Sequence, residues 1–336
     1  MTANVYFAAG ADLWPDYRTA LQSSCARLGL DVVLADTAPD PAAVDYIVHA
    51  PNAPIADFTP FTRCKAVLSL WAGVERIAPN PTLTQPLCRM VDSGLTEGMV
   101  EWVTGHALRH HLGMDAHILG QDGVWRGAVK PPLARDRRVT VLGLGELGTA
   151  CARALAALNF PVTGWSRTEK RIDGIACLCG EDGLQEALAR ADILVTLLPR
   201  TAATENLMNA DRFARMPMGS FLINPGRGPL IDDEALLAAL DAGRIAHATL
   251  DVFRVEPLPP AHPFWAHPKV TVTPHVAADT RTDTAAGVIA ENIRRGEAGE
   301  PFLFQVDRAL GWAALLPSVA FVLGDASETT TNGSPA

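Results

Sequence analysis

The feature that most constrains the fold of this chain is a glycine-rich segment over residues 139–157, VTVLGLGELGTACARALAA. A short apolar run stops at Gly143, the spacing Gly143-x-Gly145-x-x-Gly148 follows, and a helical apolar pattern comes next. Such a turn directs free backbone N–H groups and the positive end of a helix dipole to one point, which suits a pyrophosphate. Glycine-rich turns are common, but a strand before this one and a helix and strand after it favour a dinucleotide site over a purely structural turn.

The length, composition and net charge of the chain limit the class of protein to which it can belong. Its 336 residues are enough for about two domains, each with its own core. With 48% hydrophobic and 19% charged residues, the composition is that of an ordinary globular protein. The formal net charge of −9 argues against a nucleic-acid partner, because such a surface needs a basic face.

Several features predict a cytoplasmic protein that has no membrane contact. The six cysteines are scattered without a paired framework, which favours reduced thiols. The first ten residues lack a basic region and a cleavage site, so no targeting signal is expected. The late apolar run over residues 309–323 is too short to span a bilayer. We expect residues 313–336 to form a disordered tail.

Short apolar runs alternate with helical stretches along most of the chain, which predicts an α/β fold with parallel sheets. A helix over residues 96–111 links two such regions, and a last helix over 282–295 is expected to return to the first. We predict two doubly wound parallel-sheet domains with a hinged cleft between them. They are a flavodoxin-like substrate domain of residues 1–97 and 283–312 and a Rossmann-type NAD(P)-binding domain of residues 98–282.

The end of the strand after the glycine turn predicts which nucleotide binds. A carboxylate at this position would hold a ribose 2′-hydroxyl and repel a 2′-phosphate. The chain instead has Ser166, Arg167 and Thr168, which can donate hydrogen bonds to a phosphate. The alternative is a solvated basic turn, and Glu169 is a contrary residue that lies past the strand end. The missing carboxylate favours NADP over NAD.

Three further strand ends on the same rim carry polar side chains. Arg227 lies in a glycine-rich turn, Glu256 follows the strand that ends near Asp251, and His275 follows the last strand. Each alone would be a surface or structural residue, but together they supply a fixed cation, a proton donor and a carboxylate that orients it. In the first domain, the N–H groups of the Ala72–Gly73 loop either bind a small carboxylate or form an ordinary turn.

A metal site is not predicted. His106 and His110 lie four residues apart on the linking helix, a spacing that could hold a metal ion. No third ligand falls at a matching spacing, so solvated or interface histidines are the favoured interpretation.

With these motifs the chain resembles the D-isomer-specific 2-hydroxyacid dehydrogenases, and within them the NADPH-dependent glyoxylate/hydroxypyruvate reductases. The resemblance covers residues 5–312 and is carried by GLGELG, WSRT, NPGRGPLIDDEAL, LDVFRVEPLPP, PHVAA and QVDRALGW. It implies that Arg227 binds the substrate, that His275 is the acid/base and that Glu256 pairs with it. It also places the substrate carboxylate on Ala72 and Gly73, and it implies a homodimer joined through the interdomain helix region.

The same resemblance implies the cofactor contacts. Asp251 would hold the nicotinamide amide, and His275 would lie beside the ring. The full predicted set is Gly143, Gly145, Glu146, Leu147, Gly148, Ser166, Arg167, Thr168, Leu198, Pro199, Pro225, Asp251 and His275. Two departures are visible: His49 stands where relatives tend to carry a tryptophan at the pocket mouth, and the tail after Trp312 has no counterpart.

The predicted activity is NADPH-dependent reduction of small 2-oxo acids, namely glyoxylate to glycolate and hydroxypyruvate to D-glycerate. Hydride transfer would be coupled to proton donation by His275. Two alternatives stay open at this stage. One is an NAD-linked dehydrogenase of bulkier 2-hydroxy acids, and the other is a non-catalytic, nucleotide-sensing module of the corepressor type, which shares the fold.

Overall fold

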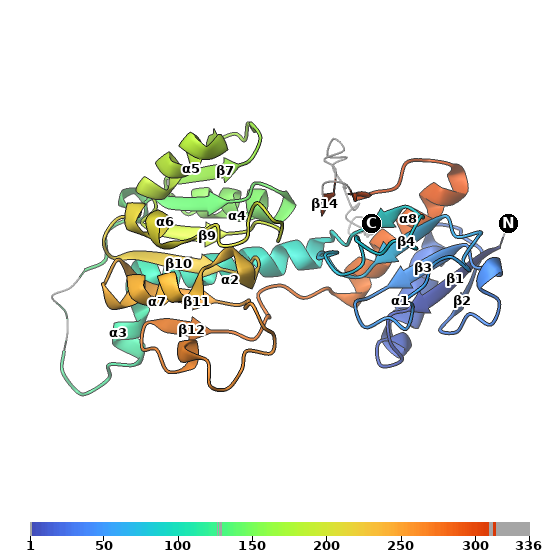
Figure 1. The fold of residues 1–336 in the computed structure, drawn as a ribbon, viewed down its shortest axis with the longest axis horizontal. Coiled ribbons are helices and arrows are strands. Elements are labelled where there is room, and N and C mark those ends of the chain that lie inside the picture. Colours follow the sequence, from blue (N-terminus) through green and yellow to red (C-terminus); the bar gives the residue numbers. More distant parts are fainter. Residues whose placement is uncertain (1, 126, 128–129, 309–311, 314–336) are drawn as a thin grey trace, which may run out of the picture.

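The computed structural model describes residues 2–125, 127, 130–308 and 312–313. Most of the predicted tail, residues 314–336, lies outside the described residues, as does most of the late apolar run. The described chain forms two lobes, each built on its own parallel sheet, and one long helix runs between them (Figure 1). We call them the N-terminal lobe, on the five-stranded sheet, and the central lobe, on the seven-stranded sheet.

The N-terminal lobe has the strand order β2-β1-β3-β4-β5, which is the flavodoxin-like order. Its strands are β1 (Ala3–Ala8), β2 (Val32–Ala35), β3 (Tyr46–His49), β4 (Ala66–Ser69) and β5 (Leu87–Cys88). The last strand is shorter than the predicted run to residue 92. It ends early because the N–H of Arg89 donates to the carbonyl of Phe304 (3.1 Å) and that of Met90 to the carbonyl of Trp71 (3.0 Å).

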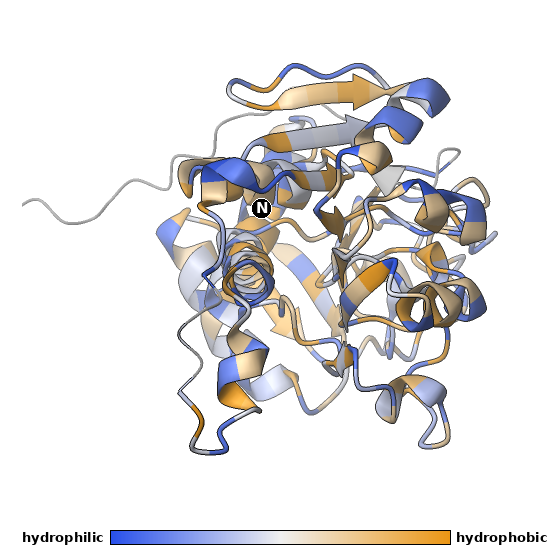
Figure 2. Ribbon diagram, turned by 90° about the vertical axis from the view of Figure 1, so that its left-hand side faces the viewer, coloured by the Kyte–Doolittle hydropathy of each residue, from blue (hydrophilic) through white to orange (hydrophobic). Residues whose placement is uncertain are grey.

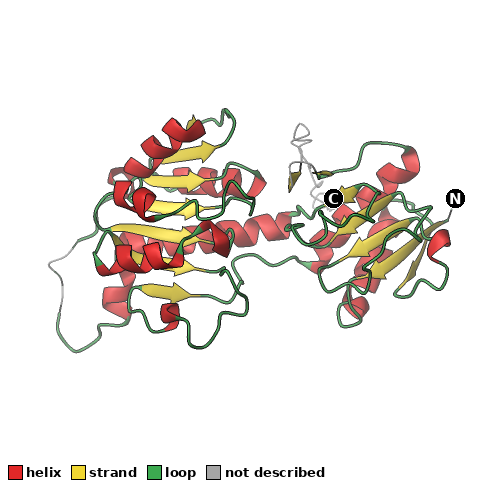
Figure 3. Ribbon diagram, in the orientation of Figure 1, coloured by secondary structure: helices red, strands yellow, loops and turns green. Residues whose placement is uncertain are grey.

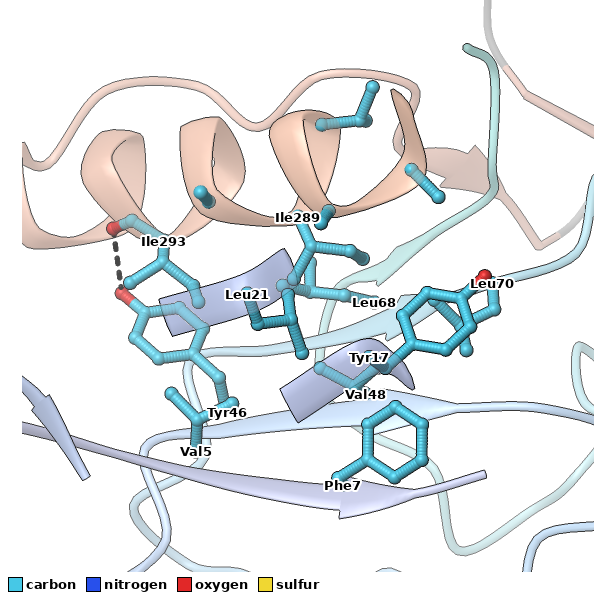
Figure 4. Close-up of a cluster of buried hydrophobic side chains, with 14 of the residues drawn as sticks. Val5, Phe7, Tyr17, Leu21, Tyr46, Val48, Leu68, Leu70, Ile289 and Ile293 are labelled. Atoms are coloured by element: carbon cyan, nitrogen blue, oxygen red, sulfur yellow. Dashed lines mark hydrogen bonds between the residues drawn. The ribbon is translucent and has the colours of Figure 1, made fainter. Parts of the chain in front are cut away.

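Helices α1 (Trp14–Arg27) and α8 (Thr282–Ala298) pack together over one face of this sheet. Although α8 comes near the end of the chain, its buried residues Ile289 and Ile293 lie in the same cluster as Val5 and Leu21 (Figure 4). The Tyr46 hydroxyl lies 3.4 Å from the carbonyl oxygen of Ile293 (Figure 4) and donates to Oε1 of Glu297 (2.8 Å), so β3 and α8 are also joined by polar contacts. The returning helix is therefore part of the N-terminal core.

The central lobe has the strand order β12-β11-β10-β9-β6-β7-β8, the Rossmann order extended by one strand. Its strands are β6 (Val139–Leu142), β7 (Val162–Ser166), β8 (Ala176–Cys179), β9 (Ile193–Thr196), β10 (Ser220–Asn224), β11 (Ile245–Leu250) and β12 (Val270–Val272). The edge strand β8 was not predicted, although residues 175–179 form a short apolar run; the strand is only partly buried. The strand order reverses between β6 and β9, which is where such folds bind ligands.

Helices cover both faces of the central sheet (Figure 3). They are α2 (Ser93–Leu112), α4 (Glu146–Ala157), α5 (Gly180–Ala189), α6 (Ala210–Arg215) and α7 (Asp233–Asp241), with the short α3 (Met114–Ile118) after α2. Short 3₁₀ helices lie at Pro41–Ala43, Ala134–Asp136, Gly228–Leu230 and Pro263–Trp265, and a small antiparallel pair joins β13 (Val306–Asp307) to β14 (Trp312–Ala313).

The chain passes between the lobes twice, once along α2 and once in the segment before α8 (Figure 1). Asp92 contacts both passages. Its buried carboxylate caps α2 by accepting from the N–H of Leu95 (3.3 Å), and it also accepts from the hydroxyl of Thr284 in the first turn of α8. The two connections thus meet at one side chain.

The predicted α/β class with two doubly wound sheets is confirmed. In Figure 2 several strands are orange and blue segments lie mostly along the periphery, as expected for sheets whose faces are buried. Among the described residues, no helix combines the length and the apolar character that crossing a bilayer requires.

Candidate active site

The glycine turn between β6 and α4 leaves room for a ligand at one position only. Gly143 has a φ of +104°, and a Cβ there would lie 2.4 Å from the carbonyl oxygen of Leu197. A Cβ on Gly148 would lie 1.8 Å from the carbonyl oxygen of Gly143, so the helix packs directly on the turn. A Cβ on Gly145 would meet nothing within 4 Å. The close packing and the open position match the predicted roles of the three glycines in a pyrophosphate site.

The first turn of α4 faces the same space. Its N-cap residue, Gly145, offers no side-chain acceptor, so the first N–H groups of the helix have no cap from that residue. Glu146 is exposed and Leu147 is half-buried beside it. A dinucleotide pyrophosphate fits these donors, since free N–H groups at a helix start bind anions.

The basic turn after β7 lies beside the glycine turn. The Ser166 hydroxyl donates to the carbonyl of Thr168 (2.7 Å), and Arg167 and Thr168 are exposed. Lys170, which the sequence showed only as a nearby charge, donates its ammonium to the carbonyl of Leu144 in the glycine turn. Glu169 points to solvent, with 72% of its side chain exposed. The turn therefore presents hydroxyl and guanidinium donors with no carboxylate among them.

The remaining predicted cofactor residues follow successive strands of the central sheet. Leu198 and Pro199 come after β9 and are half-buried, and Leu198 lies against Gly143. Pro225 follows β10 and is buried. Because the carboxyl ends of parallel strands share one edge, these residues line the rim on which the glycine turn lies.

Arg227 is held by a network at the end of β10. The Asn224 side chain accepts from the hydroxyl of Thr196 (2.7 Å) and donates to the carbonyl of Arg227 (3.2 Å). The guanidinium is 30% exposed; its Nη1 donates to the carbonyl of Gly226 (2.7 Å) and its Nε to Oε1 of Glu75 (2.9 Å). The arginine is thus fixed on its backbone side and forms an ion pair with the other lobe.

Asp251 organises the loop that carries His275. It is 1% exposed, and its carboxylate accepts from the Thr273 hydroxyl (2.6 Å) and from the N–H groups of Val276 and Ala277 (both 2.9 Å). Its carbonyl accepts from the N–H of His275 (2.9 Å), which has a φ of +56°. A strained backbone at a non-glycine residue persists where the surroundings over-determine it. Its predicted contact with a nicotinamide amide stays a prediction.

His275 and Glu256 form an ion pair at this edge. Nδ1 of His275 lies 2.8 Å from Oε2 of Glu256, while Oε1 of Glu256 accepts from the N–H of Phe253 (2.8 Å). The hydrogen bond to Glu256 raises the pKa of His275 above its ordinary value, against the opposing effect of burial. Burial would raise the pKa of Glu256, but the bonds from His275 and Phe253, with the nearby charge of Arg227, hold it below its usual range.

The predicted carboxylate loop of the N-terminal lobe lies against Arg227. A Cβ built on Gly73 would be 2.3 Å from Nη2 of Arg227 and 2.8 Å from Oε2 of Glu75, so any side chain here would have to push these two charged groups aside. The N–H groups of Ala72 and Gly73 donate to no acceptor among the described residues. The structure therefore brings the loop and the arginine together across the two lobes.

Two residues differ from the expectation at the pocket mouth. His49 is 6% exposed, because it ends β3 and its ring packs near Phe58 (centroids 6.2 Å apart), and burial lowers its pKa to about 4. It is a core residue. Trp71, which the sequence analysis did not single out, is 50% exposed directly beside Ala72. The sequence signal that could have identified Trp71 was its position shortly after a buried strand.

Glu75 was also missed, since a carboxylate next to a predicted anion site reads as a surface charge.

The histidines of α2 do not form a metal site. His110 is buried and Nε2 pairs with the Thr249 hydroxyl (2.9 Å), while His106 packs on Trp102 (centroids 4.3 Å apart). Over the described ranges, no group of three or more potential ligands could hold a metal ion.

A Rossmann sheet with a pyrophosphate-type turn, whose rim also carries an arginine and a histidine–carboxylate pair, defines a dinucleotide-dependent oxidoreductase. Comparison with known proteins gives the family. The sequence model described as "D-isomer specific 2-hydroxyacid dehydrogenase, NAD binding domain" matches residues 104–277. A curated relative from Serratia proteamaculans, "Glyoxylate/hydroxypyruvate reductase A", is 40% identical over 258 residues, which are 74% of this chain and 82% of the relative.

Solved structures agree over nearly the whole chain. A D-isomer specific 2-hydroxyacid dehydrogenase from Xanthobacter autotrophicus, in complex with NADPH and MES, superposes with a TM-score of 0.85 at 43% identity and covers 92% of this chain and 99% of that one. An NADPH-dependent glyoxylate/hydroxypyruvate reductase from Sinorhizobium meliloti, in complex with NADP and sulfate, gives 0.81 at 34% identity, with 93% and 99% covered. The chain belongs to the D-isomer specific 2-hydroxyacid dehydrogenase family and is an NAD(P)-dependent oxidoreductase.

Proposed function

We propose that the protein reduces small 2-oxo acids with NADPH, converting glyoxylate to glycolate and hydroxypyruvate to D-glycerate. The observation that carries this proposal is the His275–Glu256 pair (2.8 Å) on the rim that also holds Arg227 and the glycine turn. The similarity to reductases named for these substrates supports the substrate class.

Binding of the 2-oxo acid falls to Arg227 and the Ala72–Gly73 loop. The open N–H groups of the loop donate to the substrate carboxylate, and Nη2 of Arg227, which lies against Gly73, reaches the same place. As negative charge develops on the carbonyl oxygen, the guanidinium stabilises it. Loss of one such pre-placed donor typically costs ~10²–10³ in rate.

His275 donates the proton. Because Nδ1 is engaged by Glu256, Nε2 is the ring nitrogen left to deliver a proton to the carbonyl oxygen. The raised pKa keeps a larger fraction of the ring protonated near neutral pH than an unpaired histidine would have. Glu256 acts on the substrate only through the ring, which it orients and whose positive charge it favours.

The glycine turn and the start of α4 would hold the pyrophosphate, and Ser166, Arg167 and Thr168 would receive the 2′-phosphate. NADPH, when bound, supplies the hydride that reaches the carbonyl carbon. The complexes of the Xanthobacter and Sinorhizobium relatives with NADPH and NADP support this cofactor. The chain's own contribution is to place the carbonyl between Arg227 and His275.

Steady-state assays test the proposal directly. Oxidation of NADPH and of NADH is followed with glyoxylate, hydroxypyruvate, pyruvate and phenylpyruvate. We expect the highest kcat/KM with NADPH and the first two acids. Faster turnover of phenylpyruvate with NADH would favour a dehydrogenase of bulkier acids, and no oxidation with any acid would favour the binding-module alternative.

The basic turn gives a separate test of cofactor choice. Arg167→Asp should shift the ratio of kcat/KM for NADPH over NADH by at least tenfold towards NADH, because it replaces a phosphate donor with a repelling carboxylate. Arg171→Asp is the matched control, since this neighbour pairs with Glu169 and is exposed over 92% of its side chain. An equal shift in both variants would mean that only the net charge of the turn matters.

We further propose a homodimer. Four of the largest exposed apolar side chains lie close together on the segment that follows α2, namely Ile118, Leu119, Val124 and Trp125. Trp125 is 96% exposed, and such clusters mark interaction sites. Sedimentation equilibrium should give twice the chain mass for the native protein, and Trp125→Ser should weaken the association without abolishing cofactor binding. A monomer at micromolar concentration would contradict the proposal.

A further inference from the structure

We propose that Glu75 is a determinant of substrate affinity that exchanges between two arginines. Its carboxylate lies on Arg227 before substrate binds and passes to Arg89 when the carboxylate of a 2-oxo acid takes its place. The inference rests on the proposed function, because it assigns the 2-oxo acid to Arg227.

Glu75 now occupies the groups assigned to the substrate. Oε1 accepts from Nε of Arg227 at 2.9 Å, and Oε2 lies 2.8 Å from the point where a Gly73 side chain would begin. One carboxylate thus contacts both the guanidinium and the loop that are proposed to bind the substrate carboxylate. Nε of Arg227 donates to Glu75, and Nη1 donates one of its two hydrogens to the carbonyl of Gly226. A substrate carboxylate that binds the Nε–Nη2 edge through two parallel hydrogen bonds must displace Glu75.

Arg89 lies where a displaced Glu75 can reach it. It follows β5 directly, and the next N–H, that of Met90, donates to the carbonyl of Trp71 (3.0 Å), which places Arg89 beside the Ala72–Gly73 loop. It is half-buried, and across residues 2–308 apart from the undescribed positions 126, 128 and 129, no carboxylate lies within ion-pair distance of its guanidinium. Burial lowers its pKa, and the charges of Glu146, Arg227 and Glu75 all act on it.

The exchange keeps every charge compensated. A substrate carboxylate that displaced Glu75 into an uncharged environment would leave a half-buried carboxylate without a partner, which is costly. Transfer to Arg89 replaces one carboxylate–guanidinium pair with another and gives the lone arginine a partner. Glu75 weakens substrate binding by occupying Arg227, and Arg89 restores it by pairing with the displaced Glu75. The two residues therefore act together.

A double-mutant cycle tests this coupling. KM for glyoxylate is measured with saturating NADPH for the native protein, Glu75→Gln, Arg89→Gln and the double variant, and Glu186→Gln is the control because it removes a carboxylate from an exposed ion pair on α5. Each side chain of the Glu75–Arg227 pair is 30% exposed, and transfer of Glu75 to Arg89 offsets most of the loss of this pair, so the net competition is weak and Glu75→Gln should lower KM about two- to fivefold. Arg89→Gln should raise KM by a similar factor, and the double variant should resemble Glu75→Gln.

Two results would overturn the proposal. A higher KM in Glu75→Gln would mean that Glu75 orients Arg227 for the substrate. An equal rise from Arg89→Gln with and without Glu75 would mean that Arg89 binds the substrate itself. Calorimetry with oxalate, a carboxylate that cannot be reduced, repeats the cycle on the NADP complex without turnover. If the native protein reduces no 2-oxo acid, the proposed function fails, and the oxalate cycle still decides whether Glu75 exchanges.

Discussion

The carboxyl-end rim of the central sheet and the face that α2 covers hold histidines in opposite electrostatic states. On the rim, 47% of the His275 side chain is exposed, and a carboxylate 2.8 Å away raises its pKa. On the covered face, His110 is 4% exposed, stacks on Phe221 (centroids 4.8 Å apart) and bonds to a neutral hydroxyl. Burial, together with the charges of His247 and nearby arginines, lowers its pKa to about 2.

The difference shows that the partner and the depth of burial together decide what a histidine can do. Both rings are at least partly removed from water, which by itself disfavours the charged form. A carboxylate reverses this effect at His275, so that residue can exchange a proton near neutral pH. With only a hydroxyl as partner, His110 stays neutral and contributes packing. Three substitutions test this comparison.

The largest expected effect is that of His275→Ala. It removes the proton donor, so kcat for reduction should fall by ~10²–10⁴ while NADPH still binds. Stopped-flow or steady-state assays give kcat, and quenching of intrinsic fluorescence gives the cofactor Kd. Native-like turnover in this variant would remove His275 from the mechanism.

Glu256→Gln should have an intermediate effect. The amide keeps the shape but removes the largest cause of the raised His275 pKa, so the alkaline limb of the kcat/KM profile for reduction should move to lower pH. Reduction needs the protonated ring, so activity at neutral pH should drop by about tenfold or more. Glu256→Asp is the control, because it keeps the charge. An unmoved limb in Glu256→Gln would assign that limb to another group.

The smallest effect is expected from His110→Gln, and it concerns stability. In the unfolded chain His110 is protonated below about pH 6.5, whereas in the native protein burial lowers its pKa to about 2. Its protonation therefore favours the unfolded chain, and the free energy of unfolding falls as the pH drops below 6.5. The contribution is about 1.4 kcal/mol per pH unit. Glutamine can keep the bond to Thr249 and does not titrate. Urea unfolding between pH 6 and 4 should therefore show a shallower pH slope, with kcat/KM at neutral pH within twofold of native.

The sequence was sufficient to predict the elements whose signal is local. The glycine turn follows from residue types within a short window, and the same is true of helix α7, whose N-cap Asp232 accepts from the N–H of Ala235. The rim could also be predicted, because parallel strands end at one edge and the chain after each strand carried Arg227, Glu256 or His275.

Contacts between the lobes could not be predicted in the same way. The pairing of Glu75 with Arg227 joins residues 152 positions apart and depends on how two separate sheets face one another. The burial of His49 could not be predicted either, because it depends on the packing of its ring near Phe58. The edge strand β8 has a short apolar run but is only partly buried.

Asp92, which caps α2 and also bonds to the start of α8, has a consequence for ligand exchange. The two connections between the lobes, α2 and the segment before α8, meet at Asp92 and keep the facing surfaces of the lobes close together. Contact between these surfaces is therefore intramolecular and costs little translational entropy. Motion of the lobes about Asp92 is a rotation, so the parts of the lobes farthest from Asp92 move most and the parts beside it move least. The widest opening between the lobes would accordingly lie on the side opposite Asp92.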